Sequence, residues 1–314
     1  MKLVTYARRG SPSDKGRLGA LVGDRVVDLT EAARLSGHAA IPATLKGLIE
    51  AGPSAFEAAR KLLAFVANRS VDSDVVLDLG EVRLLPPVVD PGKFFCVGKN
   101  NKAHREELVR NRLLNEAPAE PTGFIKLNSV MVGSDATVCR PRGINTLDYE
   151  PELVFVIGRH THRVRSEDAL SHVVGIMVTN DLSARQIQRQ EVASGTRFWT
   201  AKNMPGFGPV GPFMLSLDEV DDPHDLWITC RVNGELRLRA HTGDVIFRIG
   251  DVLEHFSRWM PFEPGDMIAM GAPAGVAVGQ PNADDLYLKP GDTCEVAFEG
   301  MLPLTTHIVE ATEM

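Results

Sequence analysis

The chain has 314 residues, a formal net charge of −7 at pH 7 and 44% hydrophobic residues. This length allows one large core or two ordinary domains, and the composition is that of a globular protein. The negative charge and the lack of clustered lysine and arginine argue against a nucleic-acid-binding surface. No stretch reaches the ~20 apolar residues of a membrane span, and no signal peptide is evident, so we expect a cytoplasmic protein without a membrane partner.

Residues 1–87 are predicted to form a small α+β accessory domain. Short apolar runs predict strands, two of them joined by a hairpin at Gly23-Asp24. Thr30 is a candidate N-cap for a helix that ends at Gly37. The segment contains no cluster of chemically reactive residues, and Pro86-Pro87 marks its end.

Residues 88–314 are predicted to form a larger, β-rich domain. Short apolar runs alternate with turn signals, such as Asn233-Gly234 between two strand-like flanks and Pro264-Gly265-Asp266 further on. Helical patterns are fewer, with one beginning near Asn101 and another covering 245–260. The predicted fold class of the whole chain is therefore α+β and β-rich.

The first helix of this second domain carries a candidate catalytic pair. In GKNNKAHREE, His104 and Glu107 are three residues apart, so on a helix they share a face and Glu107 can orient the imidazole. A general base of this kind contributes ~10²- to 10⁴-fold. The same spacing is more often a surface pair, but Gly98 and the paired asparagines suggest a hinge that leads into a mobile lid.

Two glutamates precede an apolar, β-branched run in LDYEPELVFVIG. Alternate residues of a strand point the same way, so Glu150 and Glu152 aim two carboxylates at one place, and Asp181 follows another apolar run, VVGIMVTN. Alternating acids are also common on the solvent-exposed face of a strand. From the two glutamates alone, this interpretation is as well supported as a shared site. Carboxylates flanked by buried strands would repel one another, however, so we predict that they bind a cation. Oxygen ligands without His or Cys suit Mg²⁺ or Mn²⁺.

Two isolated lysines and a glycine-rich stretch complete the candidate site. Lys126 in GFIKLNS and Lys202 in WTAKN can stabilise a developing oxyanion. Judged from the neighbouring residues alone, the alternative is favoured, in which each lysine side chain extends from the edge of a strand towards solvent. In MGAPAGVAVG, Gly271 and Ala272 can offer backbone N–H groups to a substrate carboxylate. A G-x-G-x-x-G match at 206–211 is rejected as a dinucleotide site, because its internal and flanking prolines prevent a helix from opening there.

Taken together, these motifs resemble the fumarylacetoacetate hydrolase superfamily, whose catalytic domain the chain resembles from about Gly92 to Val309. The matching pieces, in the family's order, are GKNNKAHREE, GFIKLNS, DYEPEL with the later ND, SARQIQ, WTAKN, GPVGPF, VNGE, PGDMIAMGAPAG and KPGD. The resemblance implies a twisted β-roll catalytic domain behind a small N-terminal domain, and usually a homodimer.

The resemblance also implies roles for single residues. It implies a metal bound by Glu150, Glu152 and Asp181, a lid dyad of His104 and Glu107, groups around the reacting carbonyl at Gln188 and Lys202, and active-site positions for Lys126 and Arg185. The chain departs from the family where MGAPAG replaces the commoner T-G-T-P-x-G. Ala272 therefore lacks a hydroxyl that would bind a substrate carboxylate.

The leading functional prediction is metal-dependent hydrolysis of a C–C bond in an acylpyruvate-like or fumarylpyruvate-like 2,4-dioxo acid. The metal would chelate the 2-oxo and carboxylate oxygens, and His104, oriented by Glu107, would activate a water. Lys202 and Gln188 would stabilise the alkoxide, and the metal would hold the pyruvate enolate that leaves.

Two alternatives remain open from the sequence. One is isomerisation or decarboxylation of a 2-oxo-heptenedioate-type acid in aromatic catabolism, in which a base only moves a proton. The other is a metal-binding homologue without turnover. The intact set of lid, ligands and lysine argues against the latter, because a protein without turnover has no chemical reason to keep all of them.

Overall fold

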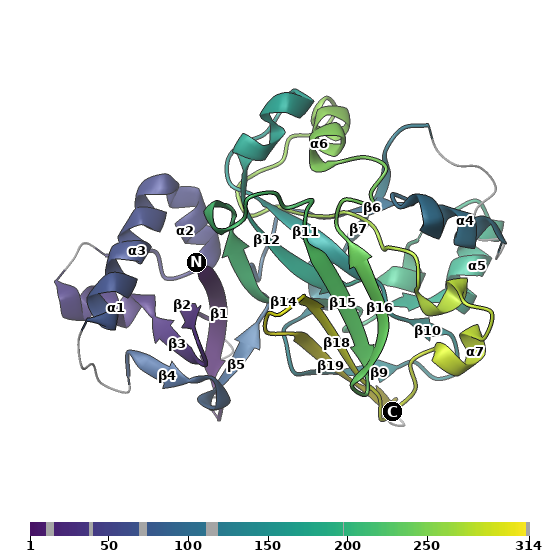
Figure 1. Cartoon of the computed structure of the whole chain (residues 1–314), viewed down its shortest axis with the longest axis horizontal. Coiled ribbons are helices and arrows are strands. Elements are labelled where there is room, and N and C mark those ends of the chain that lie inside the picture. The colour runs from purple at the N-terminus through teal and green to yellow at the C-terminus, as the bar shows by residue number, and fades with distance from the viewer. Residues whose placement is uncertain (11–15, 38–39, 69–73, 111–118, 197, 312–314) are drawn as a thin grey trace.

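The computed structural model describes residues 1–10, 16–37, 40–68, 74–110, 119–196 and 198–311. A smaller unit with helices and strands from the N-terminal part of the chain lies beside a larger, strand-rich unit (Figure 1). The predicted α+β, β-rich fold class is confirmed. Within the described residues, no helix is both long and apolar enough to cross a membrane.

The N-terminal unit packs helices against a group of strands. Its strands are β1 (Lys2–Arg8), β2 (Arg17–Val22), β3 (Arg25–Asp28), β4 (Val76–Asp78) and β5 (Val82–Leu85), and its helices are α1 (Leu29–Ser36), α2 (Leu45–Ala51) and α3 (Pro53–Ala67). The prediction that Thr30 caps the first helix is wrong, because α1 begins at Leu29 with Asp28 as its N-cap. The predicted end is confirmed, since Gly37 ends the helix with φ 67°.

One large sheet continues from this unit into the rest of the chain. The strands that extend it are β6 (Phe94–Gly98), β7 (Thr122–Lys126), β8 (Met131–Val132), β11 (Pro151–Ile157), β12 (Val173–Asn180), β14 (Gly208–Ser216) and β17 (Met267–Ala269). The order along the sheet is β4-β3-β2-β1-β14-β12-β11-β17-β6-β7, and Lys2 pairs with Leu215 where β1 meets β14. The predicted division after residue 87 therefore stays a prediction, because strand pairing crosses it.

A second, smaller sheet covers one face of the large one. Its order is β16-β15-β18-β19-β9, with bounds Glu235–His241, Trp227–Val232, Thr293–Phe298, Leu304–Glu310 and Ala136–Arg140. The β15-β16 hairpin turns at Asn233 and Gly234, which have φ 53° and 79°, as predicted. The remaining elements are the short pair β10 (Leu147–Asp148) and β13 (Ser183–Ala184) and the helices α4 (Lys102–Arg110), α5 (Arg185–Ala193), α6 (Ile249–Ser257) and α7 (Ala283–Leu286).

β11 is buried on both of its faces, which explains its uninterrupted apolar run. Leu153 and Phe155 join the core beneath the smaller sheet. Val154 and Val156 point the other way and join the core that also contains residues of α1, α2 and α3. Antiparallel pairing with β12 on one side and β17 on the other fixes the register of this strand. The end of β11 is therefore a rigid place from which to present side chains.

In the N-terminal unit, Asp28 is a buried carboxylate that joins a helix start to two strands. Its Oδ1 accepts hydrogen bonds from the backbone N–H groups of Thr30 and Glu31, each at 2.9 Å. Its Oδ2 accepts hydrogen bonds from the Tyr6 hydroxyl at 2.5 Å and from Arg17 Nε at 2.6 Å. This one side chain therefore satisfies donors from three elements.

We predict that Asp28→Asn lowers the free energy of unfolding by about 3 kcal/mol, because an amide cannot accept all of these hydrogen bonds and leaves buried donors unsatisfied. Urea denaturation measures the loss. Asp74→Asn, which removes an exposed partner of Arg8, is the matched control and should cost less than about 1 kcal/mol. Equal, small effects of the two substitutions would contradict the prediction.

The same contact predicts a pH dependence. Burial alone would raise the pKa of Asp28, but hydrogen bonds from Thr30, Tyr6 and Arg17 outweigh burial and lower it. The stabilisation is then complete above the unfolded carboxyl pKa of about 3.9, and it is lost as the pH falls through the lower folded value. The stability difference between wild type and Asp28→Asn should therefore shrink below about pH 4. A difference that grows in acid would contradict this.

Candidate metal and 2-oxo acid site

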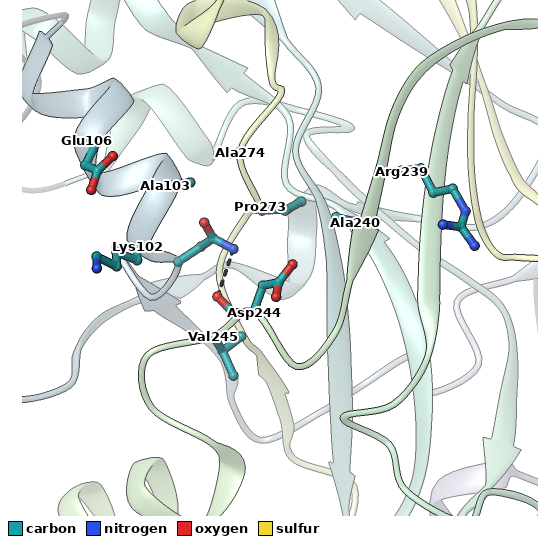
Figure 2. A pocket seen from close by; sticks show the side chains of 10 residues that line it. Lys102, Ala103, Glu106, Arg239, Ala240, Asp244, Val245, Pro273 and Ala274 are labelled. Carbon is teal, nitrogen blue, oxygen red and sulfur yellow. Dashed lines mark hydrogen bonds between the residues drawn. The ribbon is translucent and has the colours of Figure 1, made fainter.

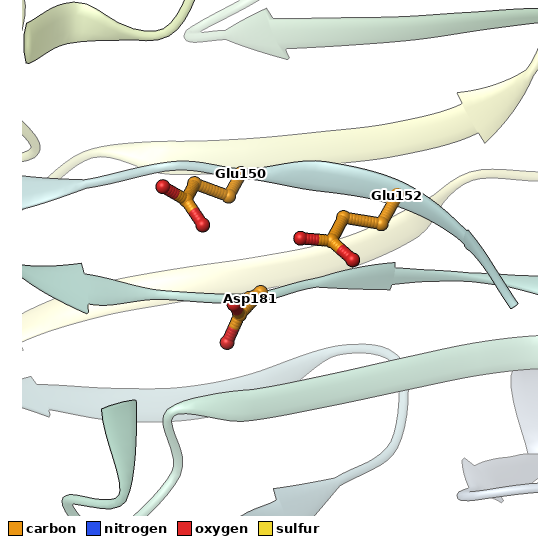
Figure 3. A group of neighbouring side chains, drawn as sticks. All are labelled: Glu150, Glu152 and Asp181. Atoms are coloured by element: carbon orange, nitrogen blue, oxygen red, sulfur yellow. The ribbon is translucent and has the colours of Figure 1, made fainter. Parts of the chain in front are cut away.

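The ends of β11 and β12 bring the three predicted metal ligands together. The backbone N–H of Asp181 donates to the carbonyl of Glu150 at 2.8 Å. The side-chain oxygen of Asn180 accepts from the N–H of Glu150 at 2.8 Å. One carboxylate oxygen from each of Glu150, Glu152 and Asp181 lies within 4.8 Å of the others, and all three residues are buried (Figure 3). Their role as ligands stays a prediction, but the geometry it requires is present.

Buried cations surround two of these carboxylates. Lys202 Nζ donates to Asp181 Oδ2 at 2.5 Å and also to Glu150 Oε2. Arg185 forms an ion pair with Glu150 Oε1. Lys126 Nζ lies 2.7 Å from Asp181 Oδ1, while it donates to two backbone carbonyls. The three basic residues predicted from the sequence therefore all reach the acidic cluster.

The ammonium of Lys202 is held in its charged form. Burial alone would lower the pKa of Lys202, but the negative charges of Asp181 and Glu150 outweigh burial and raise it above the ordinary lysine value. Lys202 is therefore a fixed positive charge and hydrogen-bond donor at neutral pH. This property suits stabilisation of an oxyanion and does not suit a general base.

Glu152 differs from the other two acids. Its Oε2 accepts from the N–H of Gly271 at 2.8 Å, and among the described residues it forms no ion pair. Burial, together with the charges of Asp181 and Glu150, raises the pKa of Glu152 well above its usual range. In the described part of the chain, Asp181 Oδ1 has the ion pair with Lys126 but no hydrogen bond of regular geometry.

This donor set fits a divalent cation. Three convergent carboxylates offer oxygen ligands of the kind that Mg²⁺ and Mn²⁺ prefer. A bound dication would also stabilise the charged form of Glu152, which Lys202 offsets only in part against burial and the charges of Asp181 and Glu150.

Arg185 and Gln188 form the next layer. Arg185 Nη1 donates to Gln188 Oε1 at 2.9 Å, so the amide nitrogen of Gln188 is the group left to donate elsewhere. Arg185 Nε donates to Asp148 Oδ2 at 2.7 Å. The sequence analysis missed Asp148, although it stands two residues before Glu150 in the same motif.

A small cavity adjoins the acids. Its volume is about 20 Å³, and its lining comprises Val97, Gly98, Lys99, Phe124, Glu150, Glu152, Asp181, Arg185, Gln188, Phe198, Lys202 and Ala272. Ala272 therefore lies where the sequence predicted a substrate contact. The N–H of Gly271 donates to Glu152 and holds a predicted metal ligand. Lys99, which the sequence analysis did not single out, has φ 61°, and its Nζ lies 5.7 Å from the centre of the Phe198 ring.

The helix that was predicted to form a lid is present as α4, and its role as a lid stays a prediction. The side chain of His104 lies outside the described residues, so the His104–Glu107 dyad stays a prediction. Glu107 is buried, and its Oε1 accepts from the N–H of Gly275 at 3.1 Å. A Cβ atom at Gly279 would overlap the Glu107 carboxylate. Glu107 therefore attaches the helix to the segment 275–279.

A larger pocket lies outside the acidic cluster. It has a volume of about 530 Å³ and lies between α4, β16 and the Pro273-Ala274 segment, where Asn101 Nδ2 donates to the Asp244 carbonyl at 3.0 Å (Figure 2). None of the three acids lines this pocket. Convergent chemistry, and not size, therefore identifies the candidate site.

Known proteins resemble this chain over most of its length. Residues 93–309 match the family model described as fumarylacetoacetate (FAA) hydrolase C-terminal. The Xenopus laevis protein named mitochondrial oxaloacetate tautomerase fahd2 is 32% identical over 300 residues, which is 94% of this chain and 87% of that protein. The Homo sapiens protein named mitochondrial oxaloacetate tautomerase FAHD2A is 35% identical over 265 residues, with 83% and 79% covered.

The fold matches solved structures as well. A maleylpyruvate hydrolase from Sphingobium sp. SYK-6, solved in complex with manganese(II) ion and pyruvate, superposes with a TM-score of 0.74 and 25% identity. The match covers 99% of this chain and 100% of that chain. A divalent metal and a 2-oxo acid thus occur together in the crystal structure of a protein of this fold.

We predict opposite effects of Glu152→Gln on the metal-free and metal-loaded protein. At neutral pH the metal-free protein must either bury the charge of Glu152 or protonate its carboxyl group, and both cost free energy. Glutamine removes this cost, so the substitution should raise the melting temperature of metal-free protein. It should also weaken Mn²⁺ binding about 100-fold, which removes the Mn²⁺-induced rise in melting temperature. Differential scanning fluorimetry and calorimetric titration measure the two effects.

Glu254→Gln, at an exposed carboxylate paired with Arg258, is the matched control and should leave both unchanged. A Glu152→Gln protein that is less stable without metal, yet binds Mn²⁺ normally, would show that the acids are not a cation site.

Proposed function

The chain belongs to the fumarylacetoacetate hydrolase family, and we propose that it is a metal-dependent tautomerase of a small 2-oxo dicarboxylic acid of the oxaloacetate kind. The observation that carries the proposal is the charged Lys202, which lies between Glu150 and Asp181 at the wall of the small cavity. Relatives that are 32% and 35% identical over 94% and 83% of this chain bear the name oxaloacetate tautomerase. Their activity suggests which of the family's reactions fits this site.

Tautomerisation moves one proton between C3 and the oxygen at C2, and it breaks no bond between heavy atoms. The barrier falls when negative charge on the C2 oxygen is stabilised and when a base stands near C3. A divalent cation held by Glu150, Glu152 and Asp181 would supply Lewis-acid stabilisation of that charge. The protein must supply the remaining donors and the base.

Two side chains of the site are suited to the C2 oxygen. The ammonium of Lys202 stays charged beside its acidic partners. The amide nitrogen of Gln188 is free to donate, because its oxygen accepts from Arg185. Preorganised donors of this kind each contribute about 10²- to 10³-fold in rate. We assign the proton transfer at C3 to His104, oriented by Glu107.

The lining of the cavity favours a short diacid. Phe124 and Phe198 form an apolar wall that limits length, and Lys99 places a positive charge against that wall. A four-carbon acid has one carboxylate beside its 2-oxo group and a second one at its far end. We assign Lys99 to the second carboxylate.

Hydrolysis of a C–C bond in an acylpyruvate is the second candidate. The manganese-bound structural relative named maleylpyruvate hydrolase favours it. A cavity of about 20 Å³ holds roughly one water, so it must widen for either substrate, and its volume does not separate the two reactions. The relatives named oxaloacetate tautomerase are more similar to this chain in sequence than the maleylpyruvate hydrolase is, and they favour tautomerisation. The predicted homodimer remains a proposal for either activity.

A direct test follows the exchange of C3 protons of oxaloacetate into D₂O by NMR, and in parallel the release of pyruvate from acylpyruvates. The Mn²⁺-loaded protein should accelerate exchange, and Lys202→Met should lower the rate about 10²- to 10³-fold. Lys93→Met removes a lysine paired with Asp266 and should keep the activity. Chelation should abolish exchange in every variant.

Release of pyruvate without exchange of C3 protons would show that the protein is a hydrolase and not a tautomerase. Full exchange after chelation, or in Lys202→Met, would overturn the mechanism for both. Circular dichroism and the melting temperature confirm that each variant is folded.

A second prediction concerns specificity. Lys99→Met should raise KM for oxaloacetate about 10- to 100-fold, because it removes a charge-assisted contact to the far carboxylate. KM for 2-oxobutanoate, which has the same carbon count and a methyl group in that place, should change less than about twofold. The same exchange assay measures both. An equal rise in KM for the two acids would show that Lys99 does not bind the second carboxylate.

A further inference from the structure

Asp148 is a fully buried carboxylate that stands outside the proposed metal site. Its Oδ1 accepts from the backbone N–H of Ala277 at 2.9 Å, and its Oδ2 accepts from the N–H of Val278 at 3.0 Å. Oδ2 also accepts from Arg185 Nε at 2.7 Å. Three donors from two distant parts of the chain therefore fix one side chain in place.

One of these parts leads to the predicted metal site. The guanidinium of Arg185 lies between Asp148 and Glu150 and forms an ion pair with each. The same guanidinium donates to Gln188. The positions of a predicted metal ligand and of a predicted oxyanion donor therefore both depend on how Arg185 is held.

The other part leads to the lid. Ala277 and Val278 belong to the short turn on which Glu107 of α4 rests, through the N–H of Gly275 and the surface of Gly279. Gly275 has φ 100°, a conformation that favours glycine. The turn is thus held by Asp148 on one side and carries the lid on the other.

We propose that Asp148 is a positioning residue that anchors both the predicted metal ligand Glu150, through Arg185, and the seat of the lid helix, through Ala277 and Val278. The inference rests on the proposed metal site. Asp148 shares Arg185 with Glu150, so loss of its charge leaves Arg185 to pair with Glu150 alone. Arg185 then competes with a bound cation for the oxygens of Glu150.

Asp148→Asn is the informative substitution. An asparagine keeps the size of the side chain, but its NH₂ group faces either the N–H of Ala277, or both the N–H of Val278 and Nε of Arg185, so donors oppose each other in either orientation. Loss of the negative charge also weakens the ion pair with Arg185 in both orientations. The variant should therefore weaken both connections without creating a cavity.

The test measures two properties besides turnover. In Asp148→Asn, the dissociation constant for Mn²⁺ should rise about 10- to 100-fold, and backbone amides of α4 should exchange with D₂O faster than in wild type. For oxaloacetate, kcat should fall while KM changes less than about threefold. Titration calorimetry and hydrogen-exchange mass spectrometry give the first two readouts, and they do not depend on which reaction the enzyme catalyses.

Asp266→Asn is the matched control. Asp266 is equally buried, but it accepts from Lys93 and from the N–H of Glu263, none of which lines the small cavity. This control should lower the melting temperature and leave both Mn²⁺ binding and the exchange of α4 unchanged. If Asp148→Asn behaves in the same way, its role is structural and the proposal is wrong.

Two further variants separate the two connections and keep the proposal testable if Asp148→Asn does not fold. Gly279→Ala displaces Glu107 alone, so it should speed exchange in α4 and leave Mn²⁺ affinity within about threefold of wild type. Arg185→Lys cannot contact Asp148 and Glu150 together, so it should weaken Mn²⁺ binding and leave α4 protected. The reverse pattern would overturn the proposal. If the wild-type protein binds Mn²⁺ but does not exchange the C3 protons of oxaloacetate, the proposed tautomerase activity is wrong. The proposed role of Asp148 is not affected by that result.

Discussion

An excess of buried negative charge is the constraint on which the candidate site depends. Four buried carboxylates surround three buried cations in the described part of the chain, which leaves one negative charge unbalanced: Asp148, Glu150, Glu152 and Asp181 against Lys126, Arg185 and Lys202. Burial of an unpaired charge is costly, so the arrangement favours either a proton on one of the acids or a bound cation. Glu152, whose pKa is raised by burial and by the charges of Asp181 and Glu150, is the acid at which either would act.

The fold tolerates this cost because the strands that carry the acids are fixed from both sides. β11 lies between β12 and β17 and is apolar on both faces, so a slip by one residue would turn Glu152 away from Asp181. The stability of the surrounding sheets thus holds together charges that would otherwise separate. Rigid presentation of this kind is what preorganised electrostatic catalysis requires.

The fold class and the three acids were predictable because their signals are local. Alternation within LDYEPELVFVIG places Glu150 and Glu152 on one side, and the apolar flanks indicate burial. Asp148 was not predictable in this way, because its partners Ala277 and Val278 stand about 130 residues further along the chain. Asp28 was missed for a different reason, since Asp and Thr are both good N-caps and only the geometry separates them.

The reaction is harder to predict than the positions of the acids, because tautomerisation, isomerisation and C–C hydrolysis share an enolate. Oxygen ligands and a lysine would serve each of these reactions in the same way, so the motifs leave the choice open. Only a feature that differs between substrates can decide it, such as the charge of Lys99 at the apolar wall of the cavity.

The pairing of β1 with β14 has a consequence for how such chains can be cut and recombined. A fragment that starts after Pro87 would leave the backbone N–H and C=O groups of β14 exposed along the edge where Lys2 and Leu3 pair with Leu215 and Met214. Naked edges of this kind recruit strands from other molecules and promote aggregation. β1 thus covers the edge of β14 in the large sheet. Chimaeras that exchange the N-terminal unit between relatives must therefore keep β1 together with β14.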